Sequence, residues 1–183
     1  MYELIILSLL MQFPVHGFLI VKIVGDMIGP VARVSNSRIY PLLSRLAADG
    51  LVEVHEEKTS ENGLPMKVYR ITDPGRERFH ELMLDVTSHS RDYREIFALK
   101  VTAFSFLQPE ERLHIIDRYI DFCRKHISHF TTEAADYRER VAQSPHDPGV
   151  VADVLEAMLH SQHQWELELN WALRLRTRES GRS

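Results

Sequence analysis

Residues 34–52 read VSNSRIYPLLSRLAADGLV, and this stretch decides the fold. Ser35 can begin a helix, because its hydroxyl can accept an unpaired N–H of the first turn. Apolar side chains then recur at helical spacing and form one stripe, and small polar and basic side chains occupy the opposite side. The helix ends at Asp49-Gly50. The inner stripe consists of Ile39, Leu42, Leu43 and Leu46.

Two helices are expected upstream of this stretch. Residues 2–12 are rich in apolar side chains and end at a Phe-Pro pair, where the proline ring disfavours helix in the residue before it. A second periodic stretch opens at His16-Gly17 and closes near Gly29-Pro30. The decisive helix is therefore the third of a small helical cluster.

A hairpin is expected downstream. Residues 51–55 and 66–72 alternate between apolar and polar side chains, as half-buried strands do. The polar segment between them contains Asn62-Gly63, a dipeptide that favours tight hairpin turns. The sequence predicts a two-stranded hairpin.

A fourth helix is expected to begin at Asp73-Pro74-Gly75, with the aspartate as its cap and proline at its first position. Three helices, a hairpin and a fourth helix, in this order, are typical of the winged helix-turn-helix. We expect this DNA-binding domain to span residues 1–85.

In such a domain the third helix enters the major groove and the hairpin, or wing, reaches the phosphate backbone. Pro41 costs an ordinary helix interior about 3 kcal/mol, so its presence next to Tyr40 needs a special reason. Unusual packing is one alternative for that pair, and solvated charge is one for the wing cations. The residues predicted to contact DNA are Arg33, Ser35, Asn36, Ser37, Arg38, Tyr40, Pro41, Ser44, Arg45, Lys58, Lys67 and Arg70.

The C-terminal half, residues 92–178, is expected to be a helical arm. Gln108-Pro109 starts a long helix in which apolar side chains recur at alternating spacings of three and four, the pattern of a coiled-coil seam. A second long helix follows a Pro-rich loop, and the two should form an antiparallel hairpin. Its apolar surface exceeds what one partner helix can cover, so we expect a homodimer. The predicted dimerisation residues are Leu113, Ile116, Ile120, Ile127, Phe130, Leu155, Met158, Trp165 and Leu169.

Composition excludes several classes of protein. The 183 residues lack the ~18-residue apolar run of a membrane helix, and the lone Cys123 cannot form an intrachain disulfide, so we expect a cytoplasmic protein without a membrane partner. No phosphate loop, nucleophile elbow or metalloprotease motif is present, and we expect neither catalysis nor a cofactor. The net charge of −4 means that DNA binding must depend on where the cations are placed.

Four segments together, residues 16–18, 34–46, 49–52 and 63–75, closely resemble the PadR family of regulators. The long arm is similar in layout to the larger PadR subgroup, which includes repressors of phenolic acid decarboxylase genes. The resemblance implies a dimeric repressor that binds a palindromic DNA operator and dissociates when a small effector binds, a phenolic acid in the founding members.

Two positions depart from the family pattern. Phe18 stands where members usually have tyrosine, and Leu64 stands where a basic residue usually follows the wing glycine. The first removes a polar contact, and the second weakens the grip of the wing on phosphate.

An aromatic acid effector would need an apolar slot with a cationic or hydrogen-bonding group, between the DNA-binding domain and the arm. For each of its predicted wall residues, ordinary packing is the competing interpretation. The predicted effector-binding residues are His16, Phe18, His160, His163 and Trp165.

Two alternative functions remain open. Cys123-x-x-His126-x-x-His129 and His160-x-x-His163 have a spacing that a transition metal could use, which would make a metal-responsive regulator. Cys123 lies on the apolar seam, however, so we expect no metal site. A winged-helix module that binds protein instead of DNA is the other alternative.

Overall fold

The computed structural model describes residues 1–28, 35–59, 65–85, 92–143 and 147–181, and for residues 56–59 and 65 the backbone alone. The chain divides into two compact units. The first comprises residues 1–85 together with the helix that ends near Ala103, and the second begins at Phe104 and contains two long helices. Mainly helical architecture with a small sheet confirms the expected fold class.

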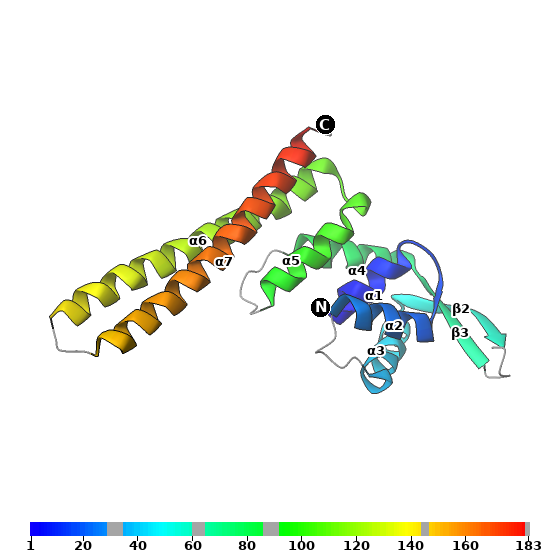
Figure 1. Ribbon diagram of the computed structural model, residues 1–183. Helices are drawn as coiled ribbons and strands as arrows, with labels where there is room; N and C mark the ends of the chain where they lie inside the picture. The colour runs from blue at the N-terminus through cyan, green and yellow to red at the C-terminus, as the bar shows by residue number, and fades with distance from the viewer. Residues whose placement is uncertain (29–34, 60–64, 86–91, 144–146, 182–183) are drawn as a thin grey trace. The chain divides into compact units, whose positions relative to one another are not determined.

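Three helices build the core of the first unit (Figure 1): α1 (Tyr2–Leu10), α2 (Gly17–Ile28) and α3 (Asn36–Ala48). The side chains from Leu4 to Leu10 are all buried, so α1 is the central helix of this unit. Burying this many aliphatic side chains, each contributing about 1.5–3 kcal/mol, supplies much of the stability of the unit.

The sheet has one more strand than the sequence predicted. Strands β2 (Val52–Thr59) and β3 (Pro65–Ile71) form the expected antiparallel hairpin, and the short β1 (Val15–His16) pairs with the other edge of β3. The expected two-stranded hairpin is therefore present, and the sequence missed only the additional strand β1. The register of β2 shifts between Val54 and Glu56, so the distal half of the wing is offset from its base.

Helix α4 (Asp73–Leu84) begins one residue earlier than expected. Its cap is Thr72, not Asp73, because the Thr72 hydroxyl accepts the N–H of Gly75 at 3.1 Å. The same hydroxyl donates to the carbonyl of Gly50. Thr72 therefore joins the end of the sheet to the turn that follows α3.

Helix α5 (Tyr93–Thr102) belongs to the first unit, although the sequence placed it with the arm from residue 92 onward. The expected hinge, residues 87–92, lies almost entirely outside the described residues. Lys100 explains part of the placement of α5, because its ammonium donates to the carbonyl of Asp85, the C-cap of α4. The side chain of Lys100 is only 2% exposed.

Lys100 gives the fold a predictable pH dependence. Burial lowers the pKa of Lys100 from 10.5 to about 8, against the opposing pull of Asp85. Between these two pKa values the unfolded chain binds the proton that the folded chain has lost, so the free energy of unfolding should rise with pH, by about 3 kcal/mol over the window. Urea unfolding at several pH values between 7.5 and 10 measures this slope.

The variant Lys100→Met should lack that slope, because it has no proton to lose. Lys125→Met is the matched control, since Lys125 is an exposed lysine on the arm and its removal should leave the slope intact. Equal slopes in the wild type and in Lys100→Met would contradict the prediction.

The second unit is a hairpin of two long antiparallel helices (Figure 1). The short turn of helix η1 (Phe104–Phe106) leads into α6 (Pro109–Ala142), which starts at a capping box formed by Gln108 and Glu111. Helix α7 (Pro148–Ser180) starts at Asp147, whose carboxylate accepts two backbone N–H groups. The start of α6 lies where the sequence predicts it, whereas α7 already begins within the expected Pro-rich loop.

Burial in the hairpin is concentrated near one end. Ile116, Ile120 and Cys123 are at most 3% exposed, and Glu179 is completely buried beside Arg112 at 3.3 Å. Farther along the hairpin Ala134 is buried, but the larger seam residues are only half-buried. Along the described residues, no helix is long and apolar enough to cross a membrane.

Candidate nucleic-acid interface

Helix α3 separates its faces as the sequence predicts. Ile39, Leu43 and Leu46 are at most 1% exposed and attach the helix to the core. The polar face opposite them is exposed to solvent, which is the arrangement a major-groove helix requires. The exposed candidates of α3 and its cap are Ser35, Asn36, Ser37, Arg38, Tyr40, Pro41, Ser44 and Arg45.

Ser35 occupies the cap position of α3, but its hydroxyl does not accept a backbone N–H there. It lies 2.8 Å from the hydroxyl of Ser37 instead. Pro41 lies inside a continuous α3 and cannot donate to the carbonyl of Ser37. The start of the recognition helix is therefore held by fewer hydrogen bonds than an ordinary helix start. Arg33, predicted just before it, lies outside the described residues.

Tyr40 has both a packing contact and an exposed edge. A Cβ atom on Gly17 would lie 2.9 Å from Cε1 of Tyr40, so glycine is required at position 17 for the ring to approach α2. Tyr40 nevertheless remains 40% exposed. Burial and the neighbouring Tyr40 raise the pKa of Tyr69 on β3. The structure is thus compatible with both interpretations of Tyr40, packing against α2 and contact with DNA.

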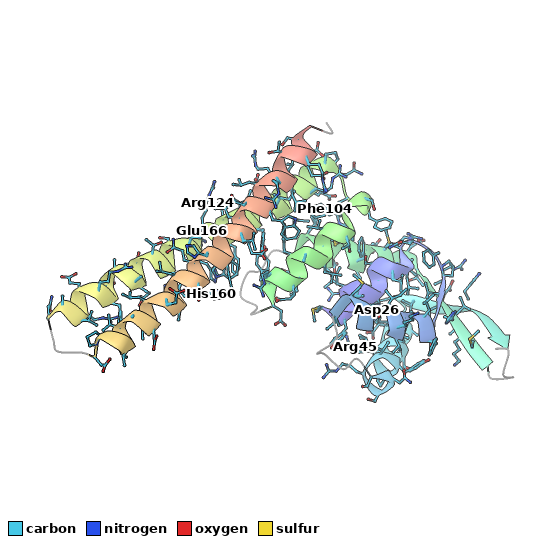
Figure 2. All side chains as sticks on the ribbon, in the orientation of Figure 1. Asp26, Arg45, Phe104, Arg124, His160 and Glu166 are labelled. Carbon is cyan, nitrogen blue, oxygen red and sulfur yellow. The ribbon has the colours of Figure 1, made fainter. Side chains whose placement is uncertain are left out.

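The two arginines of α3 contact the first turn of α1. Nη1 of Arg38 donates to the hydroxyl of Tyr2 at 2.9 Å, and its guanidinium carbon lies 5.4 Å from the centroid of the Tyr2 ring. Arg45 (Figure 2) lies 3.8 Å from the carboxylate of Glu3. Spacing within α3 could not reveal these partners, because they lie more than 30 residues away in sequence.

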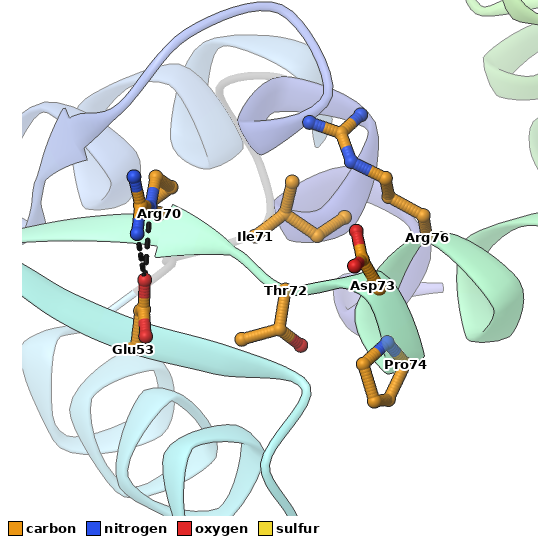
Figure 3. A pocket seen from close by; sticks show the side chains of 7 residues that line it. All are labelled: Glu53, Arg70, Ile71, Thr72, Asp73, Pro74 and Arg76. Carbon is orange, nitrogen blue, oxygen red and sulfur yellow. Dashed lines mark hydrogen bonds and ion pairs between the residues drawn. The ribbon is translucent and has the colours of Figure 1, made fainter.

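At the base of the wing, Arg70 is paired with Glu53, the residue opposite it in the register (Figure 3). The pair borders a pocket of about 460 Å³ that also includes Arg76 and Asp73. Because its lining contains two arginines and two carboxylates, the pocket has no marked preference for an anion. Lys67 is exposed, and of Lys58 only the backbone is described.

The predicted effector residues are distributed over both units. In the first, Nδ1 of His16 lies 3.2 Å from the N–H of Leu19, which satisfies a backbone donor at the start of α2. Phe18 is 66% exposed. In the second, His160 (Figure 2) contacts Gln164 on its own helix, and His163 is exposed.

Trp165, the remaining effector candidate, belongs to an aromatic cluster of the arm. The His126 ring lies 4.2 Å from the ring of Phe122 and 4.2 Å from that of Trp165. Tyr119 extends the cluster and donates to Glu168 at 2.9 Å. These contacts favour packing of α6 on α7 as the role of Trp165.

An apolar cleft of about 410 Å³ lies within the first unit, between α1, α2 and α5. The sequence did not indicate it, because its walls come from three separate segments. Among the described residues, its lining includes one side-chain carboxylate and no lysine, arginine or histidine, which suits an apolar ligand better than an organic acid. The lining residues are Met1, Ile5, Met27, Ile28, Glu95, Ala98, Leu99 and Thr102.

The chemistry of Cys123 does not favour metal binding. Its side chain is fully buried, and burial together with the carboxylate of Glu168 raises the pKa of its thiol to about 12. A metal needs the thiolate, which is disfavoured here. Among the described residues, no three His, Cys, Asp or Glu side chains gather into a candidate metal site.

A winged helix with an exposed, polar third helix is the architecture found in DNA-binding transcriptional regulators as a class. Residues 6–81 match the transcriptional regulator PadR-like family. The match to this family therefore covers the N-terminal part of the chain, less than half of its 183 residues. The matched segment begins within α1 and ends within α4, before the arm.

The solved structures that are similar to the chain include the following three. Bacillus subtilis PadR in complex with operator DNA is 19% identical, with 97% of this chain and 98% of that chain covered and a TM-score of 0.45. The same protein in complex with p-coumaric acid is 17% identical, with coverages of 97% and 98% and a TM-score of 0.38. The Vibrio cholerae virulence activator AphA is 22% identical, with both chains fully covered and a TM-score of 0.39. No curated protein sequence matches the chain.

Proposed function

We propose that this protein is a dimeric repressor that binds a palindromic operator in duplex DNA and is released by a phenolic acid. The observation that carries the DNA-binding step is the exposed polar face of α3, attached to the core by a fully buried stripe. Two such helices, one from each protomer, would enter successive major grooves about 34–36 Å apart.

Dimerisation is supported by the apolar surface of the arm. Leu113, Ile127, Phe130 and Trp165 remain half-buried although α6 and α7 cover one another. Leu173 is 38% exposed and Leu167 is 66% exposed. A second copy would remove this surface from water, at about 25 cal/mol per Å².

Release by an effector requires that the ligand bind one arrangement of the protein more tightly than the other. The phenolic acid is proposed from the resemblance of the sequence to the PadR family. The wall residues proposed from sequence, His16, Phe18, His160, His163 and Trp165, are kept as the first positions to mutate.

Fluorescence anisotropy tests DNA binding and its release by the effector. It uses duplex DNA from beside the gene, at two salt concentrations and with or without p-coumaric acid. We expect selective, salt-sensitive binding that the acid releases. Binding without release would support the proposed repressor and exclude p-coumaric acid as its effector. A protein that retains no selective duplex would favour the protein-binding module, and a response to added zinc would favour the metal-responsive regulator.

A further inference from the structure

The outward surface of α3 is made of small side chains. Ser37, Pro41 and Ser44 are exposed and recur at spacings of four and three, so they form one strip along the helix. The strip lies opposite the buried stripe of Ile39 and Leu43. A DNA groove that received this surface of α3 would meet hydroxyl groups and a proline ring before any arginine.

The arginines lie on one flank of this strip. Arg38 and Arg45 are seven residues apart, about two turns or ~10.5 Å along the same line of the helix. Both turn toward the first helical turn of the chain, where Arg38 meets Tyr2 and Arg45 meets Glu3. A flank position next to the groove is where a side chain meets phosphates rather than base edges.

Tyr2 and Glu3 act differently on their arginines. The Glu3 carboxylate offsets the charge of Arg45 and is also bonded to Arg78 at 2.8 Å. The Tyr2 hydroxyl is neutral, so it orients Arg38 without cancelling its charge. A guanidinium has five N–H donors, and the bond to Tyr2 uses one of them.

We propose that Tyr2 is a positioning residue for DNA binding, which holds Arg38 beside the recognition helix as a phosphate contact while Ser37, Pro41 and Ser44 face the bases. This inference rests on the proposed DNA-binding function. Its physical basis is pre-organisation. An arginine side chain has about 2 kcal/mol of rotamer entropy, and ordering it before binding reduces the entropy that is lost on association.

The variant Tyr2→Phe tests this role, because it keeps the ring under Arg38 and removes the hydroxyl. We expect Kd to rise about threefold to fivefold on the operator and equally on unrelated duplex, so that the specificity ratio is unchanged. Arg38→Ala should weaken both DNAs more and reduce the slope of log K against log salt by about 0.9.

The double variant separates positioning from folding. If Tyr2 acts through Arg38, Tyr2→Phe should have no further effect in the Arg38→Ala background, whereas a general effect on stability would persist there. Tyr137→Phe is the matched control, because Tyr137 lies under Arg140 in a similar pair on the arm, at 6.0 Å, and its hydroxyl should not affect DNA binding.

Three results would overturn the inference: unchanged affinity in Tyr2→Phe, an equal loss in both backgrounds, or relaxed base preference in Arg38→Ala. If the wild-type protein retains no duplex at all, the proposed function fails together with this inference. Wild-type binding with an inert Tyr2→Phe overturns the inference alone.

Discussion

Gly75→Ala should destabilise the winged helix by about 3 kcal/mol, a large effect for adding one methyl group. A Cβ atom at this position would lie 2.0 Å from the carbonyl oxygen of Leu51 and 2.8 Å from Cγ1 of Ile71. The Leu51 carbonyl cannot move away freely, because it accepts the N–H of Thr72 at 3.1 Å. Helix α4 would have to shift as a whole. The midpoint of urea unfolding, followed by circular dichroism, measures the loss.

Gly181→Ala is the control for the general effect of replacing glycine. A Cβ atom there would come no closer than 3.6 Å to another atom, which is an ordinary contact. We expect its unfolding midpoint to match that of the wild type. A Gly75→Ala protein with an unchanged midpoint would show that the junction of β3 and α4 can relax, and the prediction would be wrong.

Ile116→Asp should open the arm. Ile116 is fully buried in the seam between α6 and α7, and an unpaired carboxylate there costs about 4 kcal/mol or more unless the helices separate. We expect loss of helical ellipticity at 222 nm and, if the arm carries the dimer contact, a monomeric mass by light scattering.

Ser128→Asp is the matched control, because Ser128 is an exposed position on the same helix and the same charge is added to it. Its helicity and mass should remain those of the wild type. An Ile116→Asp protein that stays dimeric with full helicity would place the dimer contact outside this seam.

Local sequence patterns predicted the winged helix and the arm because each of their signals is local. The apolar stripe of α3, the Asn62-Gly63 dipeptide and the capping box at Gln108 are each signals within a few consecutive residues. β1 escaped detection because its two residues are too short to show alternation. Its pairing with β3 depends on tertiary packing that no periodicity records.

The candidate site was predictable in outline but not in its contacts. Periodicity identifies which face of α3 is exposed, and the structure agrees. The partners of its arginines, Tyr2 and Glu3, and the Glu53 partner of Arg70 depend on which segments fold against one another. The sequence also could not show that Thr72, and not Asp73, caps α4, because both residue types are good caps.

The placement of α5 has a practical consequence for protein engineering. A chimera that exchanged arms between relatives at residue 85 would separate the Asp85 carbonyl from its own Lys100 and supply a foreign helix in place of α5. Tyr93 and Phe97, at most 3% exposed, would be replaced at the same time. The natural joint for such a graft is after Ala103, where the first unit ends. A fragment that ends at residue 85 would thus lack part of the first unit.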